Sequence, residues 1–255
     1  MQRAETPASA LVRCHDLARM SAVIISFFAA ALLTPSKPPT QCSVSRRDAV
    51  LTSSAAALLG SRRGASAAEP AAHYRVALSV LLDPEKKTTG EIVFEVVPEW
   101  APLASERFKE LLELGFYRRS RFHRVIPGFI AQFGISTSRE QNSAWLCQTC
   151  KPLPDEARRQ SNKKGTLSFA QASAKNSRQT QVFINLSDNG GLPNFLDSQN
   201  FTPFARVVSG MELLPRLHAE GSVSQPKAAY YGEEYLSEVF PKLSVIEDVR
   251  LVSSG

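Results

Sequence analysis

One apolar stretch of the chain carries polar side chains that could do chemistry. Residues 122–134 read FHRVIPGFIAQFG, a strand-like run that holds His123, Arg124 and Gln132 and is interrupted by Pro127-Gly128. A buried arginine is costly unless its charge is paired. Arg124 therefore either lies on a solvated face or points into a groove that the strand lines, and the pattern alone supports both readings equally. In a groove, its permanently charged guanidinium would offer several hydrogen-bond donors to a substrate.

A second candidate is the pair Cys147-x-x-Cys150. Such a pair can be a redox dithiol, a disulfide or half of a metal site. The sequence around it has no second cysteine pair and no histidine cluster, which argues against a structural zinc ion. The other two cysteines, Cys14 and Cys42, fall near the N-terminus. A disulfide between Cys147 and Cys150 and an inserted loop with two thiols both stay open.

The first 67 residues differ in composition from the rest. They hold eight of the 30 Lys and Arg residues and three of the 24 Asp and Glu residues, so the remaining chain has a net charge near +1 of the total +6. This even balance excludes nucleic-acid binding by a basic surface. Two apolar segments, residues 22–33 and 49–59, are each too short for an ordinary bilayer span.

The flanks of these segments predict a targeting leader. Arg46-Arg47 precedes the second segment and Ala65-Ser66-Ala67 follows it, which resembles a twin-arginine signal with its cleavage site. Two such signals in series predict that residues 1–67 direct a plastid protein to the thylakoid lumen, with no stable membrane insertion after processing. Another secretory or exported compartment is the alternative, and a single anchor helix with a linker also stays open.

The body, residues 68–255, is expected to form one mainly β domain. Residues 73–82 and 91–97 are expected to be two strands that form a hairpin. Residues 103–114 have helical spacing, with Leu103, Phe108, Leu111 and Leu112 as the buried stripe. Further predicted elements are a long polar segment over 135–164, a helix over 211–218, a short extra helix over 230–241 and a closing strand over 243–252. Without βαβ alternation, these elements favour a closed antiparallel barrel with helices at its ends.

Several motifs in the body resemble one family. Phe-His-Arg-Val-Ile-Pro-Gly-Phe, followed by Gln132, closely resembles the active-site strand of the cyclophilins, which are peptidyl-prolyl cis-trans isomerases. Residues 165–171 and 181–186 resemble two further strands of bacterial-type members, and residues 201–212 resemble a fourth segment. The resemblance covers about residues 73–252. It implies a closed, eight-stranded antiparallel barrel capped by two helices and prolyl isomerase activity.

The resemblance also implies roles for individual residues. Rotation about a peptide bond has a barrier of about 18–20 kcal/mol, and Arg124 would be the catalytic donor that favours the twisted amide. Only X-Pro bonds populate cis appreciably, so proline-containing polypeptides are the expected substrates. The implied substrate-binding residues are Phe129, Ile130, Phe183, Phe195 and Leu196 around the proline ring, Gln132, Ala170 and Gln171 on the peptide backbone, and Phe201 in place of the usual histidine. No cofactor or metal is expected, and we expect a monomer.

Four replacements keep other functions open. Phe133, Gln171, Phe195 and Phe201 stand where the family usually has Gly, Asn, Trp and His. Because of Phe133, Gln171 and Phe201, a second hypothesis stays open: a catalytically weak module that binds proline-containing segments as an assembly or scaffold factor. A third, weaker hypothesis is a redox protein that uses Cys147 and Cys150.

Overall fold

The computed structural model describes residues 72–146 and 150–252. The predicted leader, residues 1–67, and Cys147 lie outside the described residues. Within the described part, the chain is mainly β, as expected from the sequence.

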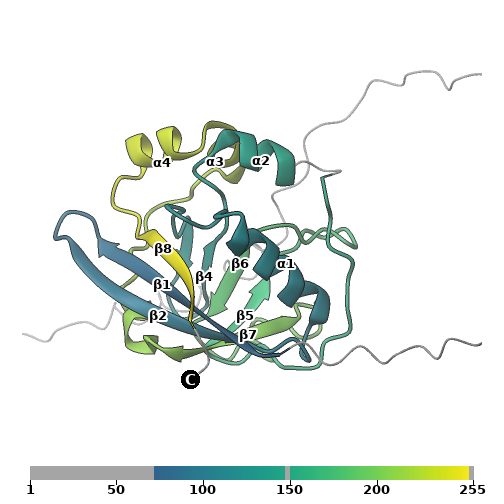
Figure 1. Ribbon diagram of the computed structural model, residues 1–255. Helices are drawn as coiled ribbons and strands as arrows, with labels where there is room; N and C mark the ends of the chain where they lie inside the picture. Colours follow the sequence, from purple (N-terminus) through teal and green to yellow (C-terminus); the bar gives the residue numbers. More distant parts are fainter. Residues whose placement is uncertain (1–71, 147–149, 253–255) are drawn as a thin grey trace, which may run out of the picture. The chain divides into compact units, whose positions relative to one another are not determined.

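Eight antiparallel strands form a single sheet (Figure 1). Its order is β3-β4-β6-β5-β7-β2-β1-β8. The strands are β1 (Tyr74–Asp83), β2 (Thr88–Val96), β3 (Arg124–Ile126), β4 (Ile130–Phe133), β5 (Thr166–Phe169), β6 (Val182–Asn185), β7 (Pro203–Ser209) and β8 (Val245–Val252). The expected hairpin is β1 with β2, in which Val76 lies opposite Phe94 and Leu78 opposite Ile92.

The two outer strands of the sheet, β3 and β8, do not pair with each other directly. The segment just before β3 hydrogen-bonds to the start of β8 instead. Arg119 N donates to Ile246 O at 2.7 Å, Phe122 N donates to Ser244 O at 3.0 Å and Ile246 N donates to Ser120 O at 2.8 Å. The expected barrel is therefore a curled sheet whose edges are joined by this irregular segment, which satisfies backbone groups that an open edge would expose.

Side-chain alternation separates the two faces of the sheet at β4, β5 and β6. Ala131, Ile184 and Leu167 lie opposite one another and belong to the main core inside the curled sheet. Their neighbours along the strands point to the opposite face. That outer face carries a smaller apolar cluster built on Ile130 and Phe183.

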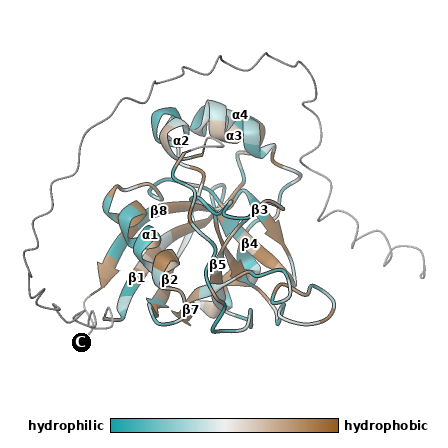
Figure 2. Cartoon of the chain, turned by 90° about the vertical axis from the view of Figure 1, so that its right-hand side faces the viewer, coloured by the Kyte–Doolittle hydropathy of each residue, from teal (hydrophilic) through white to brown (hydrophobic). Residues whose placement is uncertain are grey.

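One regular helix, α1 (Pro102–Glu113), packs on the sheet. Pro102 sits at its start, where a missing N–H costs nothing, and the helix ends just before Gly115. Ala104, Phe108 and Leu111 are buried, and Figure 2 shows hydrophobic and hydrophilic residues side by side on this helix. The predicted stripe is wrong at one position: Leu103 is 38% exposed, because in the first turn it faces away from the sheet.

The other helices depart from the prediction. The polar segment contains α2 (Arg139–Trp145), which starts where the Ser138 hydroxyl accepts from Gln141 N at 3.2 Å. The expected helix over 211–218 is a 3₁₀ helix, η1 (Met211–Arg216), with Pro215 inside it. The short extra helix is two helices, α3 (Gln225–Tyr231) and α4 (Glu233–Val239), because Gly232 breaks the run. Figures 1 and 2 both show α2, α3 and α4 grouped at one end of the sheet.

Candidate active site

Three predicted site residues lie in one row across neighbouring strands. Arg124 on β3 lies opposite Gln132 on β4, and Gln132 lies opposite Phe183 on β6. Directly opposed residues of an antiparallel pair project from the same face, so this row lies on the outer face. Arg124 Nη1 donates to Gln132 Oε1 at 3.4 Å, and Gln132 Nε2 donates to Gln181 Oε1 at 2.6 Å.

The Arg124 guanidinium has an unusual electrostatic setting. The residue is partly buried, and no carboxylate within the described ranges 72–146 and 150–252 lies within 4.0 Å of it. Burial lowers its pKa, but an arginine stays protonated at neutral pH. The side chain is thus a half-buried cation whose hydrogen-bond donors are only weakly engaged, as a group that meets a substrate should be.

An apolar cluster lies beside this row. Ile130, Phe183 and Leu196 are almost fully buried, and Phe129, Ala170 and Phe201 pack against them. The rings of Phe183 and Phe201 meet edge to face, with centroids 5.5 Å apart. The fold therefore brings together six of the predicted substrate-binding residues from four separate segments, around apolar surface that suits a proline ring.

Two other predicted substrate-binding residues lie at the edge of the apolar cluster. Gln171 Nε2 donates to Gln199 O at 2.7 Å, which ties it to the loop after Leu196. Phe195 is 45% exposed and is not a member of the apolar cluster. Its ring is available to a ligand, although it does not form part of the cluster's buried surface.

His123 is buried next to Arg124 in the sequence and is only 1% exposed. Burial lowers its pKa to about 4, although the neighbouring Gln181 side chain acts in the opposite direction. The imidazole is therefore neutral at neutral pH and buried, which agrees with a structural role.

Cys150 is part of a disulfide. Its predicted partner, Cys147, lies outside the described residues, so the predicted pairing stays a prediction. Around Cys150, Gln179 Nε2 donates to the Cys150 carbonyl at 3.0 Å, so this segment is anchored to the loop that leads into β6.

Sequence reasoning missed several polar residues of the site. Gln181 lies two residues before Phe183, and period-two alternation along that stretch would have placed both on one face. A group of buried polar residues beneath the cluster was also missed: Asn162, Ser168, Asn185, Asn189 and the partly buried Asp197. Single asparagines between apolar residues give no periodic signal, so nothing in the sequence marked them as a group.

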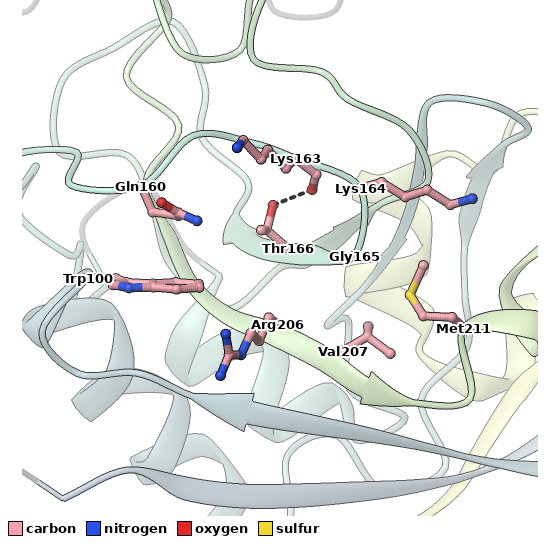
Figure 3. Close-up of a pocket in the computed structure, with 9 residues that line it drawn as sticks. All are labelled: Trp100, Gln160, Lys163, Lys164, Gly165, Thr166, Arg206, Val207 and Met211. Atoms are coloured by element: carbon pink, nitrogen blue, oxygen red, sulfur yellow. Dashed lines mark hydrogen bonds between the residues drawn. The ribbon is translucent and has the colours of Figure 1, made fainter.

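A cavity of about 510 Å³ lies elsewhere, at the start of β5. Figure 3 shows Trp100 and Gln160 at one end of it, Lys163 and Arg206 on opposite edges, and Met211 at the other end. Arg206 is paired with Glu95, with Nε to Oε2 at 2.8 Å. None of the predicted site residues lines this cavity, so it is separate from the apolar cluster of Ile130, Phe183 and Leu196.

The described residues contain no group of three or more His, Cys, Asp or Glu side chains that could hold a metal ion. Among the helices within those same residues, none is both long and apolar enough to cross a membrane.

Comparison with known proteins matches this chain to one family. Residues 81–231 match the family described as cyclophilin type peptidyl-prolyl cis-trans isomerase/CLD. The chain is 34% identical to peptidyl-prolyl cis-trans isomerase A of Dickeya dadantii over 51% of this chain and 67% of that protein. It is 32% identical to peptidyl-prolyl cis-trans isomerase B of Escherichia coli over 64% of this chain and 94% of that protein. A solved cyclophilin type isomerase of Cryptosporidium parvum is 21% identical, with a TM-score of 0.49 over 72% of this chain and 100% of that structure.

Proposed function

The chain belongs to the cyclophilin-type peptidyl-prolyl cis-trans isomerase family and has that family's isomerase activity; from this premise we propose that Arg124 is its catalytic residue and that it assists protein folding. The observation that carries the assignment is the half-buried, unpaired guanidinium of Arg124 beside the apolar cluster of Ile130, Phe183 and Leu196. A proline ring in that cluster would place its amide nitrogen near the guanidinium.

The proposed mechanism uses only side chains of this chain. Twisting an X-Pro bond breaks the amide resonance and leaves a lone pair on the proline nitrogen. A donor that is aimed at this nitrogen binds the twisted state better than either planar state, and such differential binding lowers the barrier. Gln132, held by Gln181 at 2.6 Å, would bind the substrate backbone, and the apolar cluster would hold the ring while the preceding carbonyl rotates.

Arg124→Ala tests this mechanism. We expect it to lower kcat/KM for a short X-Pro peptide by about a hundredfold, the usual cost of removing one oriented donor to the transition state. Arg124→Lys should recover only part of the loss, because an ammonium lacks the planar fork of donors. The measurement is an isomerisation assay on residues 68–255, with circular dichroism to confirm folding.

Two outcomes would contradict the assignment. Full activity in folded Arg124→Ala would remove Arg124 from the chemistry. Absence of activity in the folded wild-type protein, with retained binding of proline peptides, would favour the scaffold hypothesis that the replacements Phe133, Gln171 and Phe201 suggest.

We also propose that residues 1–67 carry the chain to a thylakoid lumen. The support is the twin arginine, Arg46-Arg47, before a short apolar run that ends in Ala65-Ser66-Ala67. Expressed in plastid-bearing cells, a fusion of residues 1–70 to a fluorescent protein should reach the thylakoid lumen, and Arg46→Lys with Arg47→Lys should block that last step. Retention of the fusion in a secretory compartment, with no effect of the double variant, would overturn the proposal.

A further inference from the structure

One fully buried asparagine links the segments that surround the proline-binding cluster. Asn162 precedes β5 and has no exposed surface. Its Nδ2 donates to Asp197 Oδ1 at 2.8 Å and to the carbonyl of Phe201 at 2.9 Å. Its Oδ1 accepts from the Ser168 hydroxyl at 2.8 Å. The Asn162 amide thus uses both its donor and its acceptor. The Oδ1 acceptor binds strand β5, and the Nδ2 donor binds the loop 196–201.

The links continue through a second buried asparagine to the opposite wall. Asn189 N donates to Asn162 O at 2.8 Å, and Asn189 O accepts from Leu196 N at 2.9 Å. Asn189 Nδ2 donates to the carbonyl of Phe129 at 2.8 Å. Through these two asparagines, the backbones of Phe129, Leu196 and Phe201 are all held in one hydrogen-bonded unit.

This unit lies on the same face of the sheet as the cluster. Ser168 lies opposite Phe183, and Asn185 lies opposite Ile130. Asn185 Nδ2 also donates to Thr166 Oγ1 at 3.0 Å and Asn185 Oδ1 accepts from Asn189 at 2.8 Å. The polar unit therefore lies next to the apolar cluster. Neither Phe129 nor the loop 196–201 can shift without breaking some of these buried hydrogen bonds.

We propose that Asn162 is a positioning residue that sets the width of the proline pocket. It does so by holding the Leu196–Phe201 wall at a fixed distance from Phe129 and Phe183. The proposal rests on the function proposed above, because it assigns a role within that pocket. Asn162 itself touches no substrate in this proposal. It acts through the cluster residues that do.

The charge of Asp197 supports this reading. Its burial acts to raise the pKa, but hydrogen bonds from the Asn162 side chain and backbone outweigh it and lower the pKa of that carboxyl. Asp197 is also paired with Arg158 at 3.3 Å. Asn162 is thus a donor bound to a carboxylate, and such charge-assisted hydrogen bonds hold their geometry better than neutral ones. Removing the amide leaves the Phe201 carbonyl without this donor.

The test compares two substrates that differ in ring size. A general loss of stability would lower the activity on both and leave their ratio unchanged. We would measure kcat and KM of Asn162→Ala with an X-Pro peptide and with the same peptide carrying pipecolic acid, the six-membered homologue of proline. A pocket of fixed width prefers the five-membered ring. We expect the proline-to-pipecolate ratio of kcat/KM to fall about tenfold, mainly through a rise of KM for proline, because small misplacements of binding groups are costly.

Asn142→Ala is the matched control. Asn142 is another buried asparagine, whose Oδ1 accepts from Ser136 N at 2.9 Å and whose Nδ2 donates to Ser136 O at 2.8 Å. It lies in α2, and none of its hydrogen bonds reaches a cluster residue. A comparable loss of stability is expected, with an unchanged ring-size ratio.

An unchanged ratio in folded Asn162→Ala would overturn the proposal, whatever happens to stability. If Asn162→Ala does not fold, Asn189→Ser is measured in its place, because this substitution removes the donor to the Phe129 carbonyl. A lower proline-to-pipecolate ratio then supports the proposal, and an unchanged ratio overturns it. If the proposed function itself were wrong, the result would be distinguishable from this one. The wild-type protein would then show no isomerisation of either peptide.

Discussion

At the scale of single residues, Arg124 shows how a charge can be half-buried with no carboxylate within 4.0 Å among the residues that the structure describes. The sequence left two readings open, a solvated face or a groove. The structure places Arg124 in the edge strand β3, partly buried, with only a weak 3.4 Å contact to Gln132. The cost of leaving the charge unpaired is limited by partial solvation. The same position leaves its donors free for a substrate amide.

His123 makes folding stability depend on pH. Its pKa in the folded protein, about 4, lies below its ordinary value of 6.5. As the pH falls below about 6.5, the unfolded chain binds a proton first, so stability is complete above that pH and is lost down to about pH 4. The loss from this residue amounts to about 3 kcal/mol.

The measurement is urea unfolding of the wild type and of His123→Gln at pH 7.5 and pH 4.5. Gln cannot titrate, so the free energy of unfolding of the variant should fall by a clearly smaller amount over this range. Carboxylates titrate in both proteins and cancel in the comparison. Equal losses in the two proteins would show that His123 is not the group responsible.

Much of the site was predictable at this scale, and the reason is a contiguous motif. Arg124, Phe129, Ile130 and Gln132 come from one stretch of nine residues, and the resemblance covers them as a unit. Gln181 and Asn162 were missed because their roles depend on hydrogen bonds between distant segments. Such contacts leave no local pattern in a single sequence.

At the scale of elements, α1 obtains its N-terminal cap from far along the chain. Glu156 Oε2 accepts from Leu103 N at 2.9 Å and Oε1 accepts from Ala104 N at 3.1 Å. The same carboxylate pairs with Arg178 at 3.1 Å, and the Arg178 side chain is only 2% exposed. One acidic side chain thus satisfies the free N–H groups of a helix and a buried cation.

Glu156→Ala should therefore lower the free energy of unfolding by about 3 kcal/mol, since it removes the nearest carboxylate from the buried Arg178, which then has the Pro154 carbonyl and the more distant Asp155 carboxylate, at 4.0 Å. The control is Glu85→Ala in the turn between β1 and β2, where Glu85 pairs with Lys242 at 3.1 Å and both side chains are exposed. Exposed pairs contribute about 1 kcal/mol or less. Urea unfolding at neutral pH measures both, and similar losses would contradict the capping role.

The elements that the sequence misplaced have separate causes. The β1–β2 hairpin, β8 and α1 were predicted from their residue pattern within a few residues, and the other strands from the family resemblance. α2 has seven residues, of which only Asn142 and Trp145 are buried, so no apolar stripe marked it. In η1, Pro215 lacks the N–H that a regular helix would use, which favours the short 3₁₀ form.

At the scale of the described domain, curling of the sheet creates two separate apolar regions. The inner one contains the aromatic core, with Phe108 and Phe204 centroids 5.0 Å apart. The outer one is the smaller cluster around Phe183. Packing inside the sheet therefore maintains the fold, while the outer cluster can differ between relatives with little effect on the core. This separation accounts for replacements such as Phe201 in a chain that keeps the family fold.

The helices α3 and α4 are fastened to the domain at several points. Arg121 Nε donates to Glu233 Oε2 at 3.1 Å. At Gly232, with φ of 64°, an added Cβ would lie 2.5 Å from the Thr137 carbonyl. Ile135 and Leu243, which flank sheet strands, share one apolar cluster with Ala228 and Leu236 of these helices.

This fastening has a consequence for how the chain could have changed over time. An appended segment can be gained or discarded freely only while the rest of the molecule does not depend on it. Here the loss of residues 225–239 would bring Ile135 and Leu243 to the surface and leave Arg121 without its carboxylate. A viable deletion of α3 and α4 would therefore need compensating substitutions at Ile135, Leu243 and Arg121.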